Sequence, residues 1–222
     1  MNVEKLIAAF RIASGDVAEP NFWSDEQVMD WLSEAQNEAC VRGRLLHEDA
    51  RPEVCRITLV AGQFSYALHK SLYEITHLRL QPIAGGPSRP IVLKSREWLD
   101  AEMPDWREST RPACMAIQRD TSLRLVGAFA SDDVLHLEGY RLPLKALASE
   151  ADKPEIHEAH HEHLVEWALH KAFSVPDAET IDPARAKAAE QEFTRYFGPM
   201  PDADLRRSTR QDIEHRNVPF IL

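Results

Sequence analysis

The chain has 222 residues, of which 44% are hydrophobic and 28% charged, and this is the composition of an ordinary globular protein. Its formal net charge is -10, which argues against tight nucleic-acid binding as the main role because DNA-gripping proteins usually carry a basic face. No apolar run approaches the roughly 18 residues that a membrane helix needs. The N-terminus lacks a basic region followed by an apolar core, so no signal peptide is expected.

The three cysteines, Cys40, Cys55 and Cys114, are widely spaced and odd in number. This pattern fits neither a disulfide framework nor a zinc site. We therefore expect free, mostly buried thiols in a protein of a reducing compartment.

The first part of the chain predicts two helices joined by a loop. Apolar residues recur at helical spacing over residues 1–14, and glycine, proline and asparagine indicate a loop over residues 15–22. Ser24 is a good N-cap and Gln27 completes a capping box, so the second helix is predicted to run from there to about Leu46. Two aromatic residues of this region are expected to pack in the core: Trp23 and Trp31.

From Val54 onward the apolar period changes to the alternation that is typical of strands. We expect strands over residues 55–59, 64–66, 73–82, 91–93, 113–118, 123–126 and 134–142. Ser95 begins a brief capped helix on one connection. Short strands at this spacing favour an antiparallel sandwich or barrel.

The chain becomes helical again after this β region. A helix is predicted over residues 154–173, because Pro154 suits a first helical turn, where its missing N–H costs nothing. Its apolar stripe consists of Ile156, Leu164, Val165, Trp167, Ala168, Leu169 and Ala172. A last helix is expected to begin at Asp182 and Pro183 and to end at Gly198.

Residues 199–222 differ from the rest of the sequence. Arginines alternate with acidic residues, and few residues are apolar before the end of the chain. Such a segment has too few apolar residues to bury a large surface against the rest of the protein. We therefore expect it to be either disordered or ordered against a partner.

The sequence therefore predicts an α+β fold, in which an antiparallel β-sandwich or barrel-like domain is inserted into an α-helical bundle. The expected parts are N-terminal bundle helices (1–52), the inserted β domain (53–145), C-terminal bundle helices (146–198) and an extended C-terminal tail (199–222).

One cluster could in principle hold a metal ion, and it runs from His157 to His163. On a helix His157 and His161 would lie at i and i+4, and the spacing formally matches the His-Glu-x-x-His pattern of zinc proteases. No third ligand is evident in a suitable segment. A solvated or interface cluster is favoured, with His160 and His163 at the buried edge of the stripe, and no metal site is predicted.

Other catalytic patterns are missing from the sequence. It has no Gly-x-Ser-x-Gly elbow, and no cysteine has the flanking residues of an activated thiol. Gly85 and Gly86 precede Pro87, which suits a turn better than a phosphate-binding loop. No pair of carboxylates stands out as general acid and base. We expect no catalytic residue and no cofactor, so the protein is predicted not to be an enzyme.

The sequence resembles the head-to-tail adaptor proteins of tailed bacteriophages, which are also called head-completion or tail tubular A-like proteins. The resemblance covers most of the chain and rests on the order of its segments and on their overall residue pattern. The segments that carry it are residues 23–36, 57–63, 123–125, 135–143, 154–156, 164–169 and 193–198.

This resemblance implies a structural virion protein that assembles as a ring of twelve copies. Such rings lie at the head-tail junction, beneath the portal, where they receive the tail or nozzle. It further implies synthesis in the bacterial host cytoplasm, no membrane partner, and ejection of genomic DNA through the ring without specific binding. The acidic balance of the chain fits a conduit, because lumen-facing carboxylates would repel DNA phosphates.

In related adaptors the C-terminal segment reaches toward the portal. The residues expected to contact the portal here are Arg206, Arg207, Arg210, Phe220, Ile221 and Leu222. We expect the arginines to pair with portal carboxylates and the three apolar residues to fill a pocket. Ordering this segment costs conformational entropy, so it should fold only when the partner supplies contacts.

Two other functions stay open from the sequence. One is a β-sandwich module that binds carbohydrate or protein, which exposed aromatic residues on the strands would favour. The other is a metal-dependent hydrolase that uses the cluster from His157 to His163, which stoichiometric zinc would favour.

Overall fold

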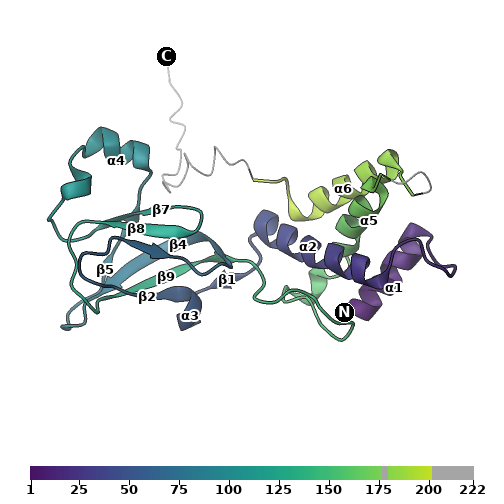
Figure 1. Cartoon of the computed structure of the whole chain (residues 1–222), viewed down its shortest axis with the longest axis horizontal. Helices are drawn as coiled ribbons and strands as arrows, with labels where there is room; N and C mark the ends of the chain where they lie inside the picture. The colour runs from purple at the N-terminus through teal and green to yellow at the C-terminus, as the bar shows by residue number, and fades with distance from the viewer. Residues whose placement is uncertain (177–179, 202–222) are drawn as a thin grey trace, which may run out of the picture. The chain divides into compact units, whose positions relative to one another are not determined.

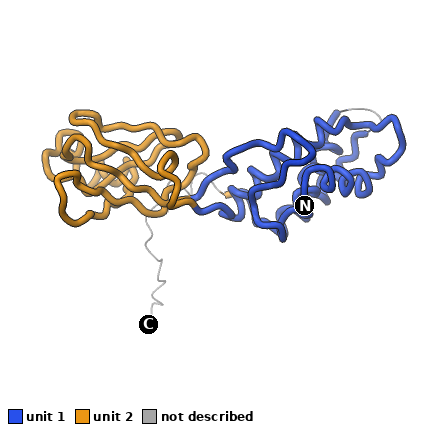
Figure 2. The backbone as a smooth tube through the Cα atoms, turned by 90° about the horizontal axis from the view of Figure 1, so that it is seen from below, with its two compact units in different colours: residues 1–47, 140–200 blue, residues 48–139, 201–222 orange. Residues whose placement is uncertain are grey.

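A computed structural model describes residues 1–176 and 180–201 of the chain (Figure 1). The chain divides into two compact units (Figure 2). Residues 1–47 and 140–200 form the first, here called the helical unit, and residues 48–139 lie in the second, here called the β unit. The fold is α+β, as predicted.

The helical unit combines helices from the two ends of the described chain. They are α1 (Val3–Ser14), α2 (Asp25–Gly43), α5 (Leu164–Ser174) and α6 (Pro183–Phe197), with the short 3-10 helix η2 (Glu158–His160). The predicted capping box begins α2: Ser24 Oγ accepts from Gln27 N at 3.2 Å, and Gln27 Oε1 accepts from Ser24 N at 3.0 Å. This helix ends at Gly43 and not at Leu46, because Arg44 adopts the left-handed conformation with φ 49°.

Aromatic residues fill one end of the core of the helical unit. Trp23 is 5% exposed, and its ring lies 5.6 Å from Phe10 of α1 and 5.7 Å from Phe173 of α5 in edge-on contacts. Trp31 of α2 is partly buried against the same core. The core packing predicted for both tryptophans is confirmed. The most buried aromatic of α6 is Phe193, which contacts Trp167 of α5 at 5.1 Å between ring centroids.

The prediction of a helix over residues 154–173 is wrong for the first half of that range. His157 has extended backbone angles and caps η2 with its side chain, whose Nδ1 accepts from Ala159 N at 3.2 Å. A side chain that bonds its own neighbouring backbone in this way competes with helix formation. The regular helix α5 begins only at Leu164.

The β unit contains two sheets. The first has the order β1 (His47–Glu48), β9 (Val134–Arg141), β4 (Leu72–Gln81), β5 (Arg89–Pro90), with β2 (Arg56–Thr58) also pairing with β9. The second has the order β3 (Ser65–Ala67), β8 (Ser122–Val126), β7 (Met115–Gln118), β6 (Val92–Leu93). Three short helices complete the unit: α3 (Pro52–Cys55), α4 (Arg96–Glu102) and η1 (Trp106–Glu108).

The β region departs from a purely antiparallel arrangement at β6 and β7. β6 runs parallel to β7, with Val92 opposite Met115. Parallel neighbours need a long crossover connection, and here α4 and η1 lie on that connection. The expected strand at residues 55–59 also starts later, at Arg56, because Cys55 ends α3.

Candidate interaction surfaces

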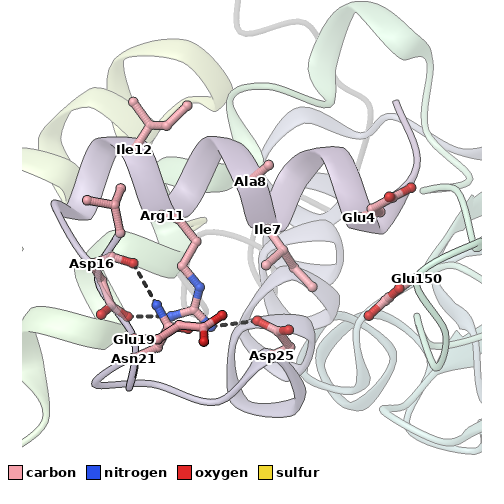
Figure 3. A pocket seen from close by; sticks show the side chains of 11 residues that line it. Glu4, Ile7, Ala8, Arg11, Ile12, Asp16, Glu19, Asn21, Asp25 and Glu150 are labelled. Carbon is pink, nitrogen blue, oxygen red and sulfur yellow. Dashed lines mark hydrogen bonds and ion pairs between the residues drawn. The ribbon is translucent and has the colours of Figure 1, made fainter.

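A groove of about 530 Å³ opens on the helical unit beside α1 (Figure 3). We call it the α1 groove. Its walls come from α1, from the loop that follows this helix, from the first residue of α2 and from Glu150. The backbone holds Glu150 next to α1, because Glu4 N donates to Glu150 O at 3.1 Å.

A buried carboxylate orders the loop of this groove. Asp16 is 3% exposed and pairs with the guanidinium of Arg11, which also contacts Asp25 at 2.5 Å between Nη2 and Oδ1. Asp16 Oδ1 also accepts from Phe22 N at 2.9 Å. Figure 3 shows Arg11 reaching from α1 to both aspartates. The wall of the groove is therefore fixed by charge-assisted hydrogen bonds, which are stronger than neutral ones.

The α1 groove carries a negative charge that its own arginine does not balance. Five carboxylates and one guanidinium line it, which gives a formal charge of -4. Arg11 pairs with Asp16 and Asp25, and three exposed glutamates remain around it: Glu4, Glu19 and Glu150.

Apolar side chains accompany this charge. Ile12 and Val17 line the groove and are 76% and 69% exposed, and Phe22 of the same loop is 62% exposed. The surface therefore suits a partner segment that is both basic and partly apolar.

A second candidate surface lies at three loop tips of the β unit. We call it the loop cluster, and it consists of Val60, Phe64, Ile83 and Phe129. The first three are 52%, 39% and 65% exposed, and the ring of Phe129 lies edge-on to Phe64 at 5.7 Å.

A single aspartate ties these loops together. Asp133 is 4% exposed, and its two carboxylate oxygens accept from Ile83 N and Ala130 N, both at 3.1 Å. Its backbone carbonyl accepts from Leu59 N at 2.8 Å. The exposed apolar side chains therefore stand on an ordered base, which favours a role in protein contacts.

The histidines at residues 157–163 serve packing in the helical unit. His161 is 1% exposed, and its Nε2 lies 2.9 Å from Ile156 O. His163 stacks on Tyr196 at 3.5 Å, and His160 Nδ1 lies 3.1 Å from Tyr196 Oη. Burial, helped by the neighbouring histidines, lowers the pKa of His160.

These contacts correct the expectation for the buried edge of the cluster, because His161 is buried and His160 and His163 are only partly so. Within residues 1–176 and 180–201, no group of three or more His, Cys, Asp or Glu side chains is arranged to hold a metal ion.

None of the three cysteines, all of which the structure describes, forms a disulfide bond, and two of them are buried. Burial raises the pKa of Cys40 in α2 to about 12, with a further contribution from the charge of Glu155. Cys55 is also buried, whereas Cys114 is exposed. The prediction of free, mostly buried thiols is confirmed.

The residues predicted to contact a portal lie outside the described part of the chain. They are Arg206, Arg207, Arg210, Phe220, Ile221 and Leu222. Sequence reasoning missed both surfaces described above. The signal for the α1 groove was available, because Val17 and Phe22 are large apolar residues in a loop that also contains Gly15 and Pro20.

Comparison with known families supports one of the functions that the sequence left open. The family model for the SU10 adaptor protein matches residues 1–216, which include both units. The chain belongs to the SU10 adaptor family. The resemblance to phage adaptors is therefore confirmed, and the protein has a structural role in a bacteriophage.

A comparison with curated proteins gives no match. In the part of the chain that the structure describes, no helix is long and apolar enough to cross a membrane.

Proposed function

We propose that this protein assembles as a ring beneath the portal of the phage head and joins it to the tail, as a non-enzymatic part of the virion. The match of the SU10 adaptor family over residues 1–216 carries this proposal, because it spans both units and not one module alone. A ring of twelve copies follows from the resemblance to head-to-tail adaptors.

Two exposed surfaces support a protein with several partners. The α1 groove on the helical unit is acidic and the loop cluster on the β unit is apolar. Each unit thus offers a distinct chemistry for contacts between copies or with neighbouring virion proteins.

The C-terminal residues supply the contact with the portal in this proposal. Arg206, Arg207 and Arg210 pair with portal carboxylates, and charge-assisted bidentate bonds make such pairs specific. A short apolar anchor at the end of the chain fills a pocket of the portal: Phe220, Ile221 and Leu222.

The genome leaves the head through the ring without specific binding. The formal charge of -10 supports this, because acidic side chains that face the lumen repel DNA phosphates. Reversal of several lumen-facing acids to lysine should slow ejection.

The decisive experiment is the mass of the complex by light scattering, first on the protein alone and then with the portal protein of the same phage. We expect about twelve copies to join each portal ring. Deletion of residues 205–222 should abolish this binding, whereas a compact protein that ignores the portal would contradict the proposed function.

A further inference from the structure

We propose that the α1 groove binds the basic stretch of residues 205–210 of the same chain in the free protein. Only the consequence for the portal rests on the proposed function: the portal would have to displace this stretch from the groove before using the same arginines. The occupancy of the groove stands on the described residues and the sequence.

Charge complementarity selects the occupant. The groove has a formal charge of -4, and its exposed glutamates Glu4, Glu19 and Glu150 surround the ion pairs of Arg11. Residues 205–210 read Leu-Arg-Arg-Ser-Thr-Arg, with three arginines and no acidic residue. No other window of five residues in the sequence contains three Lys or Arg residues.

The apolar part of the groove matches the same stretch. Ile12 and Val17 line the groove and are 76% and 69% exposed. Leu205 opens the basic stretch and offers an aliphatic side chain next to Arg206. The stems of arginine side chains also cover apolar surface while their charged ends stay near carboxylates.

The chain is long enough to return to the groove. The start of α6 lies beside the end of α1, because Arg185 Nη2 donates to Ala13 O and Ser14 O, both at 3.1 Å. At ~1.5 Å per residue the 15 residues of α6 carry the chain about 22 Å away. The nine residues from Phe197 to Arg206 span up to about 30 Å when extended.

Tethering makes such a contact effective even when each ion pair is weak. Solvent-exposed ion pairs are individually weak, because water screens their charges. A short linker raises the effective concentration of the attached segment to roughly the millimolar range. The groove can therefore be occupied in the free protein and remain open to competition by a stronger partner.

Trypsin provides a direct test on the full-length protein, because Arg206, Arg207 and Arg210 are themselves cleavage sites. The variant E4Q/E19Q/E150Q removes the unpaired charge of the groove, adds no tryptic site and keeps the pairs of Arg11. We expect cleavage after the three arginines to become about tenfold faster at low ionic strength. Added salt should accelerate cleavage of the original protein toward the rate of the variant.

The matched control is D30N/E162Q/E190Q, which neutralises three exposed carboxylates of the same unit outside the groove. Its cleavage rate should equal that of the original protein. Equal rates for all three proteins would overturn the proposal. Protection that rises with protein concentration would assign the groove to the segment of a second copy and would likewise overturn binding within one chain.

A second measurement does not depend on the glutamine variant. In a C114S background, which removes the exposed thiol, the pair E19C/T209C should form a disulfide within one chain. Absence of this bond, or a bond only between chains, would contradict the proposal. Binding to the portal is scored separately, so protected arginines in a protein that ignores the portal would refute the proposed function alone.

Discussion

The contacts within the helical unit and the contacts within the β unit join parts of the chain in different ways. In the helical unit, segments that precede and follow the β unit meet: Val3 N donates to Asp152 O at 2.9 Å, and Leu147 N donates to Ser33 Oγ at 2.7 Å. The β unit is one continuous stretch of chain, residues 48–139. The helical unit can therefore be completed only after the chain has passed through the β unit.

Buried polar side chains connect strands and loops that lie far apart in the sequence of the β unit. Gln118 of β7 is 7% exposed and bonds the backbone of β4 twice, to Ile75 N at 3.1 Å and to Tyr73 O at 2.9 Å. Asp133 connects three loops in the same way. The comparison teaches that the helical unit joins segments from both sides of the β unit, whereas the β unit packs within one continuous segment. Within that segment, apolar residues such as Leu135 and polar ties such as that of Gln118 both contribute.

The largest expected effect comes from a matched pair of core truncations, Phe193→Ala in α6 and Leu135→Ala in β9. Both side chains are fully buried. Truncation should destabilise the affected unit by about 3–5 kcal/mol for the phenylalanine and about 2–5 kcal/mol for the leucine. Hydrogen exchange measured on peptides of α2 and β8 should show each loss in its own unit.

The same hydrogen-exchange measurement can refute the expectation that the two units lose stability separately. Equal loss of protection in both units after either substitution would mean that they unfold as one cooperative body. The difference in contacts between the two units would then have no consequence for their stability.

A smaller effect is expected from the two buried aspartates, Asp16 in the helical unit and Asp133 in the β unit. Asp16→Asn weakens the pair with Arg11, and Asp133→Asn places an amide N–H₂ group against a backbone donor, Ile83 N or Ala130 N. Hydrogen bonds to charged groups contribute about 1.5–3 kcal/mol, so each variant should lose about that much.

The location of the loss distinguishes the two aspartate variants. Faster exchange should appear over residues 15–24 for Asp16→Asn and over residues 82–84 and 129–131 for Asp133→Asn. Loss of protection outside these segments would show that the aspartates support more than their own loops.

Features set by neighbouring residues could be predicted from the sequence. The capping box of Ser24 and Gln27 and the cap of α6 by Asp182 both form as expected, because their partners lie within three residues. The α+β class followed from the change of apolar period near Val54.

Features set by distant partners could not be predicted in this way. Pro154 satisfies the rule for a helix start, yet the helix begins at Leu164. His161, which precedes it, contacts a distant partner, because its Nδ1 lies 3.0 Å from Met1 O. The parallel pair of β6 and β7 depends on where a long connection returns the chain. One wall of the α1 groove depends on the ion pairs of Arg11 with Asp16 and Asp25. No spacing rule predicts these two pairs from the sequence.

The smallest expected effect is a pH dependence shared by both units, through His160 in the helical unit and His136 in the β unit. Burial is the main cause that lowers the pKa of each; the other histidines at residues 157, 161 and 163 add to it for His160, and Arg79 and Arg56 add to it for His136. The unfolded chain, with a pKa of 6.5, then binds protons at higher pH than the folded protein. Stability is therefore lost as the pH falls through 6.5 toward the folded pKa.

His160→Gln and His136→Gln should each flatten this loss in one unit only. Hydrogen exchange corrected for its intrinsic pH dependence, compared at about pH 7.5 and about pH 5.5, would measure it. Both side chains are partly exposed, so solvent screening keeps the change below that of the aspartate variants. An unchanged pH dependence in both variants would assign the acid sensitivity of each unit to other groups. A change in the unit that does not contain the substituted histidine would show that protonation in one unit affects the stability of the other.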